Sequence, residues 1–125
     1  MLDKDSKILV VDDSKVIRLS MRNFLKEVGY NNVILGEDGV QALSLYNDEK
    51  PDLLILDVVM PNLTGDEALE KLREKDKNTP VIMLTSVADG KVMDKCKELG
   101  ICSYIMKPLT KVTGPKILGD ALDKI

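Results

Sequence analysis

Five short apolar runs, separated by amphipathic stretches, constrain the fold of this chain more than any other feature. The runs occupy residues 8–11, 33–35, 53–56, 81–84 and 104–106. Most are continuous rather than alternating, which is typical of strands that are covered on both faces by helices. The sequence therefore predicts a buried sheet whose strands are parallel.

The stretches between the runs carry apolar residues at helical spacing. We expect helices over residues 15–28, 39–49, 64–72, 90–99 and 115–124. The first helix has one apolar face, which comprises Val16, Ile17, Met21, Phe24, Leu25 and Val28. The second has Val40, Ala42, Leu43 and Tyr46 on its apolar face. Because strand and helix alternate, the sequence predicts an α/β fold with right-handed crossovers.

Size and composition exclude several classes of protein. The chain has 125 residues, and we expect residues 1–125 to form a single domain with no output domain. The net charge of -3 and the lack of a basic stripe argue against a nucleic-acid partner. No apolar run approaches the length of about 20 residues that spans a bilayer, and the N-terminus is too polar for a signal peptide. We therefore expect a cytoplasmic protein with no membrane partner.

Polar residues follow four of the apolar runs directly. Asp12 and Asp13 follow the first, Asp57 the third, Thr85 the fourth and Lys107 the fifth. In open parallel sheets, ligands bind at the carboxyl ends of the strands. If the strand order is 2-1-3-4-5, these ends are neighbours, and carboxylates, hydroxyls and an ammonium group converge on one crevice.

Each of these residues also has a simpler explanation: Asp12, Asp13 and Thr85 can cap helices, Asp57 can begin a turn, and Lys107 can be a solvated strand end. Their coincidence at one edge favours a site, because clustered carboxylates repel one another unless a cation joins them. The chain has no histidine, so any metal should be a hard cation such as Mg²⁺, bound by oxygen. Phosphoryl transfer fits this set of groups, with Asp57 as the acceptor, Asp12 and Asp13 at the metal, and Lys107 and Thr85 at the phosphoryl oxygens.

Several motifs together resemble the receiver domain of two-component response regulators. They are ILVVDDS (8–14), GEDG (36–39), QAL (41–43), DVVMP (57–61), NLTG (62–65), LTS (84–86) and YIMKP (104–108). The resemblance covers nearly the whole chain, and the motifs stand in register. It implies a flavodoxin-like (βα)5 three-layer sandwich with a parallel sheet of order 2-1-3-4-5, and a stand-alone, CheY-like phosphorylation switch.

The resemblance also implies how the switch is loaded. Asp57 would take its phosphoryl group from a sensor histidine kinase or a histidine phosphotransfer protein. Mg²⁺ would be bound by Asp13, Asp57 and the backbone carbonyl of Val59, with Asp12 acting through water. The domain would be a regulator rather than an enzyme, since it would catalyse only its own phosphorylation and dephosphorylation.

The resemblance also implies how the phosphorylated domain would signal to a downstream protein. Thr85 and Tyr104 would be the switch pair, and the Lys107–Pro108 peptide bond would be cis, a state found mainly before proline. The face built from the fourth helix, fifth strand and fifth helix would meet a downstream protein, and the domain would be a monomer or a weak phosphorylation-dependent dimer. The role remains open between a chemotaxis-type regulator, a phosphorelay intermediate and a receiver that acts on a larger regulator.

Local departures from the family pattern affect the output face and the lifetime of the modification. Leu109 replaces an aromatic residue, and residues 111–115 look irregular, which leaves the start of the last helix open. We expect Met106 to lie in the core. Val59 and Val87 occupy positions that in this family border the path of the attacking water, and neither can orient water, so slow self-dephosphorylation is expected.

Two other classes of function are disfavoured. An aspartate-nucleophile phosphatase of the haloacid dehalogenase type requires a second acidic residue two positions after the nucleophile, where this chain has Val59. A flavin carrier on the same fold requires a phosphate loop after the first strand, where Asp12 and Asp13 would repel the phosphate.

Overall fold

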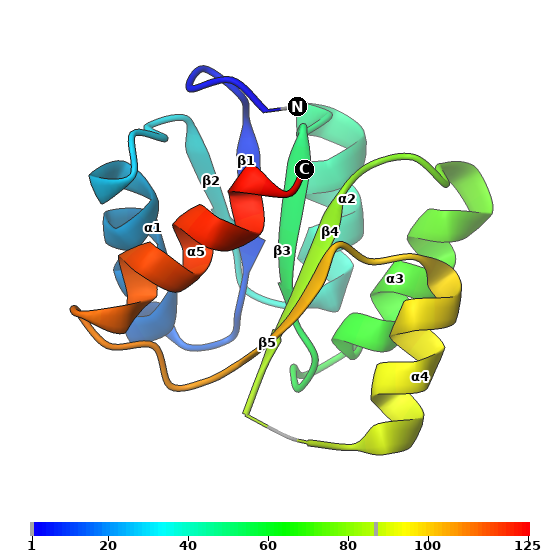
Figure 1. Ribbon diagram of the computed structural model, residues 1–125. Coiled ribbons are helices and arrows are strands. Elements are labelled where there is room, and N and C mark those ends of the chain that lie inside the picture. The colour runs from blue at the N-terminus through cyan, green and yellow to red at the C-terminus, as the bar shows by residue number, and fades with distance from the viewer. Residues whose placement is uncertain (1, 87) are drawn as a thin grey trace.

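The structure, a computed structural model, describes residues 2–86 and 88–125. Strands and helices alternate along these residues, as Figure 1 shows. The elements are β1 (Ile8–Val11), α1 (Lys15–Glu27), β2 (Val33–Gly36), α2 (Gly39–Glu49), β3 (Leu53–Asp57), α3 (Gly65–Lys75), β4 (Val81–Thr85), α4 (Gly90–Leu99), β5 (Ser103–Met106) and α5 (Thr113–Asp123).

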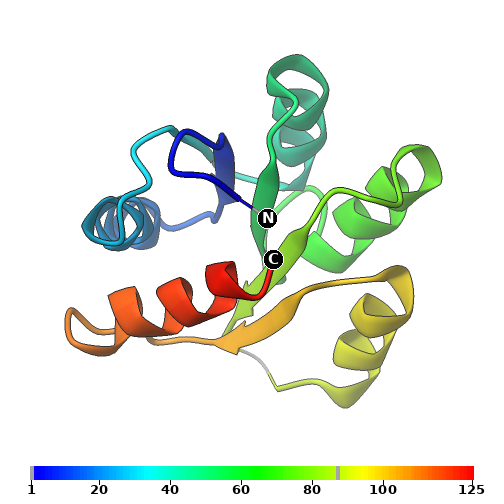
Figure 2. The same cartoon turned by 45° about the horizontal axis from the view of Figure 1, so that its top comes forward.

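The strands form one parallel sheet of order β2-β1-β3-β4-β5, which confirms the predicted flavodoxin-like topology. Helices α1 and α5 cover one face of the sheet, and α2, α3 and α4 cover the other (Figure 2). Every residue of β1, β3 and β4 is buried, because these three strands lie between neighbours and under helices on both faces. The apolar runs at residues 8–11, 53–56 and 81–84 thus form the inner strands, and the shorter runs at 33–35 and 104–106 lie in the edge strands.

Alternate residues of each inner strand supply two separate cores. Ile8 and Val10 point to the face covered by α1 and α5, whereas Leu9 and Val11 point to the other face. Among the described residues, no helix is both long and apolar enough to cross a bilayer.

Three apolar residues that we expected in the core lie at the surface. Val16 is 72% exposed, Val40 55% and Met106 40%. Val16 and Val40 are the second residues of α1 and α2, and the first turn of a helix that follows a strand stands beyond the edge of the sheet. Met106 ends β5, which has a strand neighbour on one side only. At Val16 and Val40 the helical periodicity is correct, but the sheet does not extend beneath the first turn of either helix.

Helix α5 begins at Thr113, earlier than expected from Pro115. The Thr113 hydroxyl accepts a hydrogen bond from the N–H of Thr110, and the Gly114 N–H donates to the carbonyl of Thr110, so a turn already forms there. Pro115 therefore occupies the first turn, where its missing N–H is tolerated.

Candidate functional site

The carboxyl ends of β1, β3, β4 and β5 meet at one edge of the sheet. The register pairs Val11 with Leu56, Asp57 with Leu84, and Thr85 with Met106. Asp12, Asp57, Thr85 and Lys107 therefore lie at or just after neighbouring strand ends. The predicted convergence follows directly from the parallel order.

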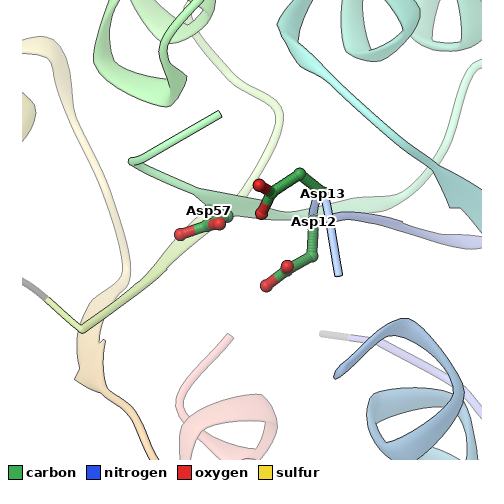
Figure 3. A group of neighbouring side chains, drawn as sticks. All are labelled: Asp12, Asp13 and Asp57. Atoms are coloured by element: carbon green, nitrogen blue, oxygen red, sulfur yellow. The ribbon is translucent and has the colours of Figure 1, made fainter. Parts of the chain in front are cut away.

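Three carboxylates gather at this edge. Asp12 and Asp13 follow β1 and Asp57 ends β3, and one carboxylate oxygen from each lies within 4.8 Å of the others. Figure 3 shows the three side chains at the end of the sheet. Asp12 is fully buried and Asp57 is 3% exposed, whereas Asp13 is exposed. The cluster is thus buried at its base and open to solvent on the side of Asp13.

The Lys107 ammonium group lies inside this cluster. Its Nζ is 2.6 Å from Oδ2 of Asp12 and 3.3 Å from Oδ2 of Asp57. The Lys107 N–H donates to the carbonyl of Thr85 at 2.8 Å, and the Lys107–Pro108 peptide bond is cis. Among these four side chains, three carboxylates face one ammonium group, which leaves an excess of negative charge.

Burial, and then the nearby charge of Asp12, raise the pKa of Asp57 to about 6, although the Lys107 ammonium group opposes both effects. At neutral pH the Asp57 carboxylate is therefore ionised but poorly solvated. A poorly solvated carboxylate is a stronger base and nucleophile than one in water.

The donor set fits a hard divalent cation. Oδ1 of Asp12 accepts a hydrogen bond from the N–H of Ser14 at 2.9 Å. Oδ2 of Asp12 is the one buried side-chain nitrogen or oxygen in the described part of the chain that has no hydrogen bond, and it forms an ion pair with Nζ of Lys107 at 2.6 Å. A buried carboxylate oxygen without a hydrogen bond, an excess of negative charge and donors that are all oxygen match the requirements of Mg²⁺.

The other predicted residues lie around this cluster. Thr85 is fully buried at the end of β4, and Val59, just after β3, is 53% exposed. Tyr104 on β5 is half-buried and packs against the apolar cluster that contains Cys96 of α4. Val87, the second residue predicted to border the water path, lies outside the described residues.

The predicted output face carries a hollow. Its lining includes Met93 and Lys97 of α4, Tyr104 of β5, and Ile117 and Lys124 at α5. The hollow therefore joins the three elements that the family resemblance assigned to partner binding, and Tyr104 contributes to it.

Arg18, which the sequence did not mark as a site residue, supports the turn that carries the carboxylates. Its Nη1 donates to the backbone carbonyl of Asp12 at 2.8 Å, and its Nη2 lies 3.5 Å from the Glu37 carboxylate after β2. A basic residue on an amphipathic helix usually belongs to the solvated face, so nothing in the sequence indicated this contact.

Comparison with known proteins gives a consistent result. A family model described as the response regulator receiver domain matches residues 8–118. Chemotaxis protein CheY-3 of Vibrio cholerae is 35% identical over 127 residues, which cover 100% of this chain and 95% of that protein. Probable transcriptional regulator ycf27 of Guillardia theta is 40% identical over 111 residues, which cover 87% of this chain and 42% of that protein.

Solved structures agree with these matches. A chain in the crystal structure of the CheX-CheY-BeF3-Mg+2 complex from Borrelia burgdorferi has a TM-score of 0.85 and 28% identity, over 94% of this chain and 87% of that one. Vibrio cholerae chemotaxis protein CheY4 has a TM-score of 0.82 and 33% identity, over 94% of this chain and 98% of that one.

Proposed function

Because this chain belongs to the response regulator receiver domain family, we propose that it is a signalling switch that accepts a phosphoryl group on Asp57. One observation carries the proposal: the carboxylates of Asp12, Asp13 and Asp57 and the Lys107 ammonium group meet at the carboxyl edge of the sheet. An arrangement of this kind can both attack a phosphoryl group and neutralise its charge.

Asp57 is the proposed nucleophile. A carboxylate oxygen of Asp57 forms a bond to phosphorus while the bond from phosphorus to the donor breaks, and the leaving group takes the electron pair. Lys107, already 3.3 Å from the Asp57 carboxylate, would then pair with a phosphoryl oxygen. The Thr85 hydroxyl, at the end of the neighbouring strand, is the proposed donor to a second phosphoryl oxygen.

We propose that Asp12, Asp13, Asp57 and the backbone carbonyl of Val59 hold Mg²⁺, with Asp12 acting through water. When bound, the cation supplies positive charge to the carboxylates and to the transferred group. The residues of the chain perform the remaining tasks: Asp57 attacks, and Lys107 neutralises.

The proposed donor is a phosphohistidine on a sensor histidine kinase or a histidine phosphotransfer protein in the cytoplasm. Since residues 1–125 would act as one domain, the output would be a change in the α4–β5–α5 face, with Thr85 and Tyr104 as the switch pair. A chemotaxis-type role is supported by the full-length match to CheY-3, and a role as a phosphorelay intermediate is the alternative. In either role the domain is a regulator rather than an enzyme with an external substrate.

The test uses acetyl phosphate as a small donor together with Mg²⁺, followed by intact mass measurement. The wild-type chain should gain one phosphoryl group, and the gain should be absent from Asp57→Ala and when EDTA removes the metal. Asp48→Ala, which removes an exposed aspartate of α2, is the matched control and should be phosphorylated like the wild type. An unmodified wild-type chain would refute the proposal.

A further inference from the structure

We propose that Asp38 and Asn62 are positioning residues that hold the β3–α3 loop, residues 58–64, in the conformation that presents the Val59 carbonyl to Mg²⁺. This inference rests on the proposed function, because it concerns the same metal. Neither side chain belongs to the carboxylate cluster, and their link joins the loop to the start of α2.

The loop is tightly folded between β3 and α3. The Leu63 N–H donates to the carbonyl of Pro61, and the Gly65 N–H donates to the carbonyl of Val58, both at 2.8 Å. Asn62 has a φ of 69°, in the left-handed region, which asparagine tolerates better than most residues other than glycine. The backbone therefore reverses direction at Asn62, three residues after Val59, whose carbonyl is the proposed ligand.

A side-chain hydrogen bond holds this reversal. The Nδ2 group of Asn62 donates to Oδ2 of Asp38 at 2.8 Å. Oδ1 of Asp38 accepts from the N–H of Gln41 at 2.8 Å and so caps α2. The Gln41 N–H and then the Asn62 amide hold the pKa of Asp38 below its usual range, so the acceptor is charged and both bonds are strengthened. One carboxylate oxygen of Asp38 thus caps α2, and the other binds the Asn62 amide.

Close backbone contacts limit the loop on both sides. A Cβ on Gly39, next to Asp38, would lie 2.2 Å from the carbonyl oxygen of Leu63. A Cβ on Gly65 would lie 1.9 Å from the carbonyl oxygen of Asp57. The starts of α2 and α3 therefore pack directly against the loop and its preceding strand, and only glycine permits this approach.

The Asp38–Asn62 bond thus adds a polar side-chain contact to a loop that is also held by backbone hydrogen bonds, by the close glycine contacts and by the buried side chains of Val58 and Met60. Residues that orient metal ligands without touching the metal typically change metal affinity by about 10–100-fold when they are replaced. Here the glycine contacts remain after the bond is lost, so we expect the lower end of that range, about tenfold weaker Mg²⁺ binding.

Two variants isolate the bond from its surroundings. Asp38→Ser retains an acceptor for the Gln41 N–H, because serine is a good N-cap, but removes the oxygen that binds Asn62. Asn62→Gly retains the freedom to adopt a positive φ but removes the amide. Asp89→Ser is the matched control, since Asp89 caps α4 by accepting from the N–H groups of Lys91 and Val92.

The measurement is calorimetric titration of the unphosphorylated chain with Mg²⁺, together with urea unfolding in EDTA. Each single variant should bind Mg²⁺ about tenfold more weakly, and the double variant no more weakly than either single, because both remove the same bond. Asp89→Ser should bind like the wild type.

The inference is overturned if either single variant binds Mg²⁺ like the wild type, or if the two losses add in the double variant. Lower resistance to urea with unchanged Mg²⁺ affinity would also overturn it, because the bond would then serve only the fold. In these outcomes the wild type still binds Mg²⁺ and the proposed function stands. A wild type that binds no Mg²⁺ would instead refute the proposed metal site itself.

Discussion

Replacing Asp57 with asparagine should stabilise the metal-free fold. Asp57 is 3% exposed, and its pKa is raised from 3.8 to about 6, first by burial and then by the charge of Asp12, with Lys107 opposing both. The ionised carboxylate is therefore less favourable in the fold than in the unfolded chain. Asparagine has a similar shape and no charge, so Asp57→Asn removes this penalty.

The size of the effect follows from the difference in pKa. Each pKa unit is worth about 1.4 kcal/mol, so a rise from 3.8 to about 6 corresponds to up to about 3 kcal/mol. For an acid whose folded pKa is raised, the penalty is absent below the unfolded pKa of 3.8, grows between 3.8 and about 6, and is complete above about 6. The advantage of Asp57→Asn should follow the same pH course.

The assay is urea unfolding in EDTA, followed by circular dichroism, from about pH 8 down to below the unfolded pKa of 3.8. Asp48→Asn, at an exposed position on α2, is the control and should match the wild type throughout. Added Mg²⁺ should close the gap, because a ligand that binds only the folded wild type stabilises it by about 2.7 kcal/mol at a hundredfold excess over its Kd.

Equal stability of Asp57→Asn and the wild type at about pH 8 in EDTA would refute the reasoning. A gap that persists unchanged in acid would refute it equally, since the cause would then be packing rather than charge.

Three further predictions address the lifetime of the modification, the close packing at the site and a distant carboxylate. Val59 is 53% exposed, and an asparagine side chain at this position can orient water. Val59→Asn should therefore shorten the half-life of the phosphorylated protein, followed by intact mass measurement. An equal or longer half-life would contradict slow self-dephosphorylation in the wild type. Gly65→Ala places a Cβ 1.9 Å from the Asp57 carbonyl oxygen and should lower the free energy of unfolding, measured with urea, by about 2–4 kcal/mol. An unchanged free energy of unfolding would show that the backbone shifts without cost. The pKa of Asp76 lies well below its usual value, chiefly because its carboxylate accepts from the Thr79 hydroxyl. Asp76→Asn should therefore lower stability at neutral pH, and the deficit should shrink as pH falls below 3.8 towards the depressed pKa; a pH-independent deficit would exclude this cause.

The sheet and the site cluster could be predicted because both depend on local patterns. The continuous apolar runs marked the strands to within one residue at each end, and parallel order alone brings Asp12, Asp57 and Lys107 to one edge. Val16 and Val40 were wrongly placed in the core, since helical periodicity does not indicate where the sheet beneath a helix ends.

Contacts between segments that are far apart in the sequence could not be predicted. Asp38 and Asn62 are 24 positions apart, and each has a sufficient local explanation, as a helix cap and as a turn residue. Arg73, near the end of α3, is buried and donates to the carbonyls of Leu99, the last residue of α4, and of Gly100, although charged residues are normally exposed. Such contacts depend on how the helices and loops pack against one another in three dimensions, which the periodicity of a single segment does not describe.

The most direct test of the central claim is to locate the phosphoryl group. The chain is phosphorylated with acetyl phosphate and Mg²⁺, the acyl phosphate is reduced with borohydride to homoserine, and peptides are sequenced by mass spectrometry. We predict homoserine at position 57 and aspartate at positions 12 and 13. Homoserine at position 12 or 13, or no homoserine at all, would contradict the assignment of Asp57 as the phosphoryl acceptor.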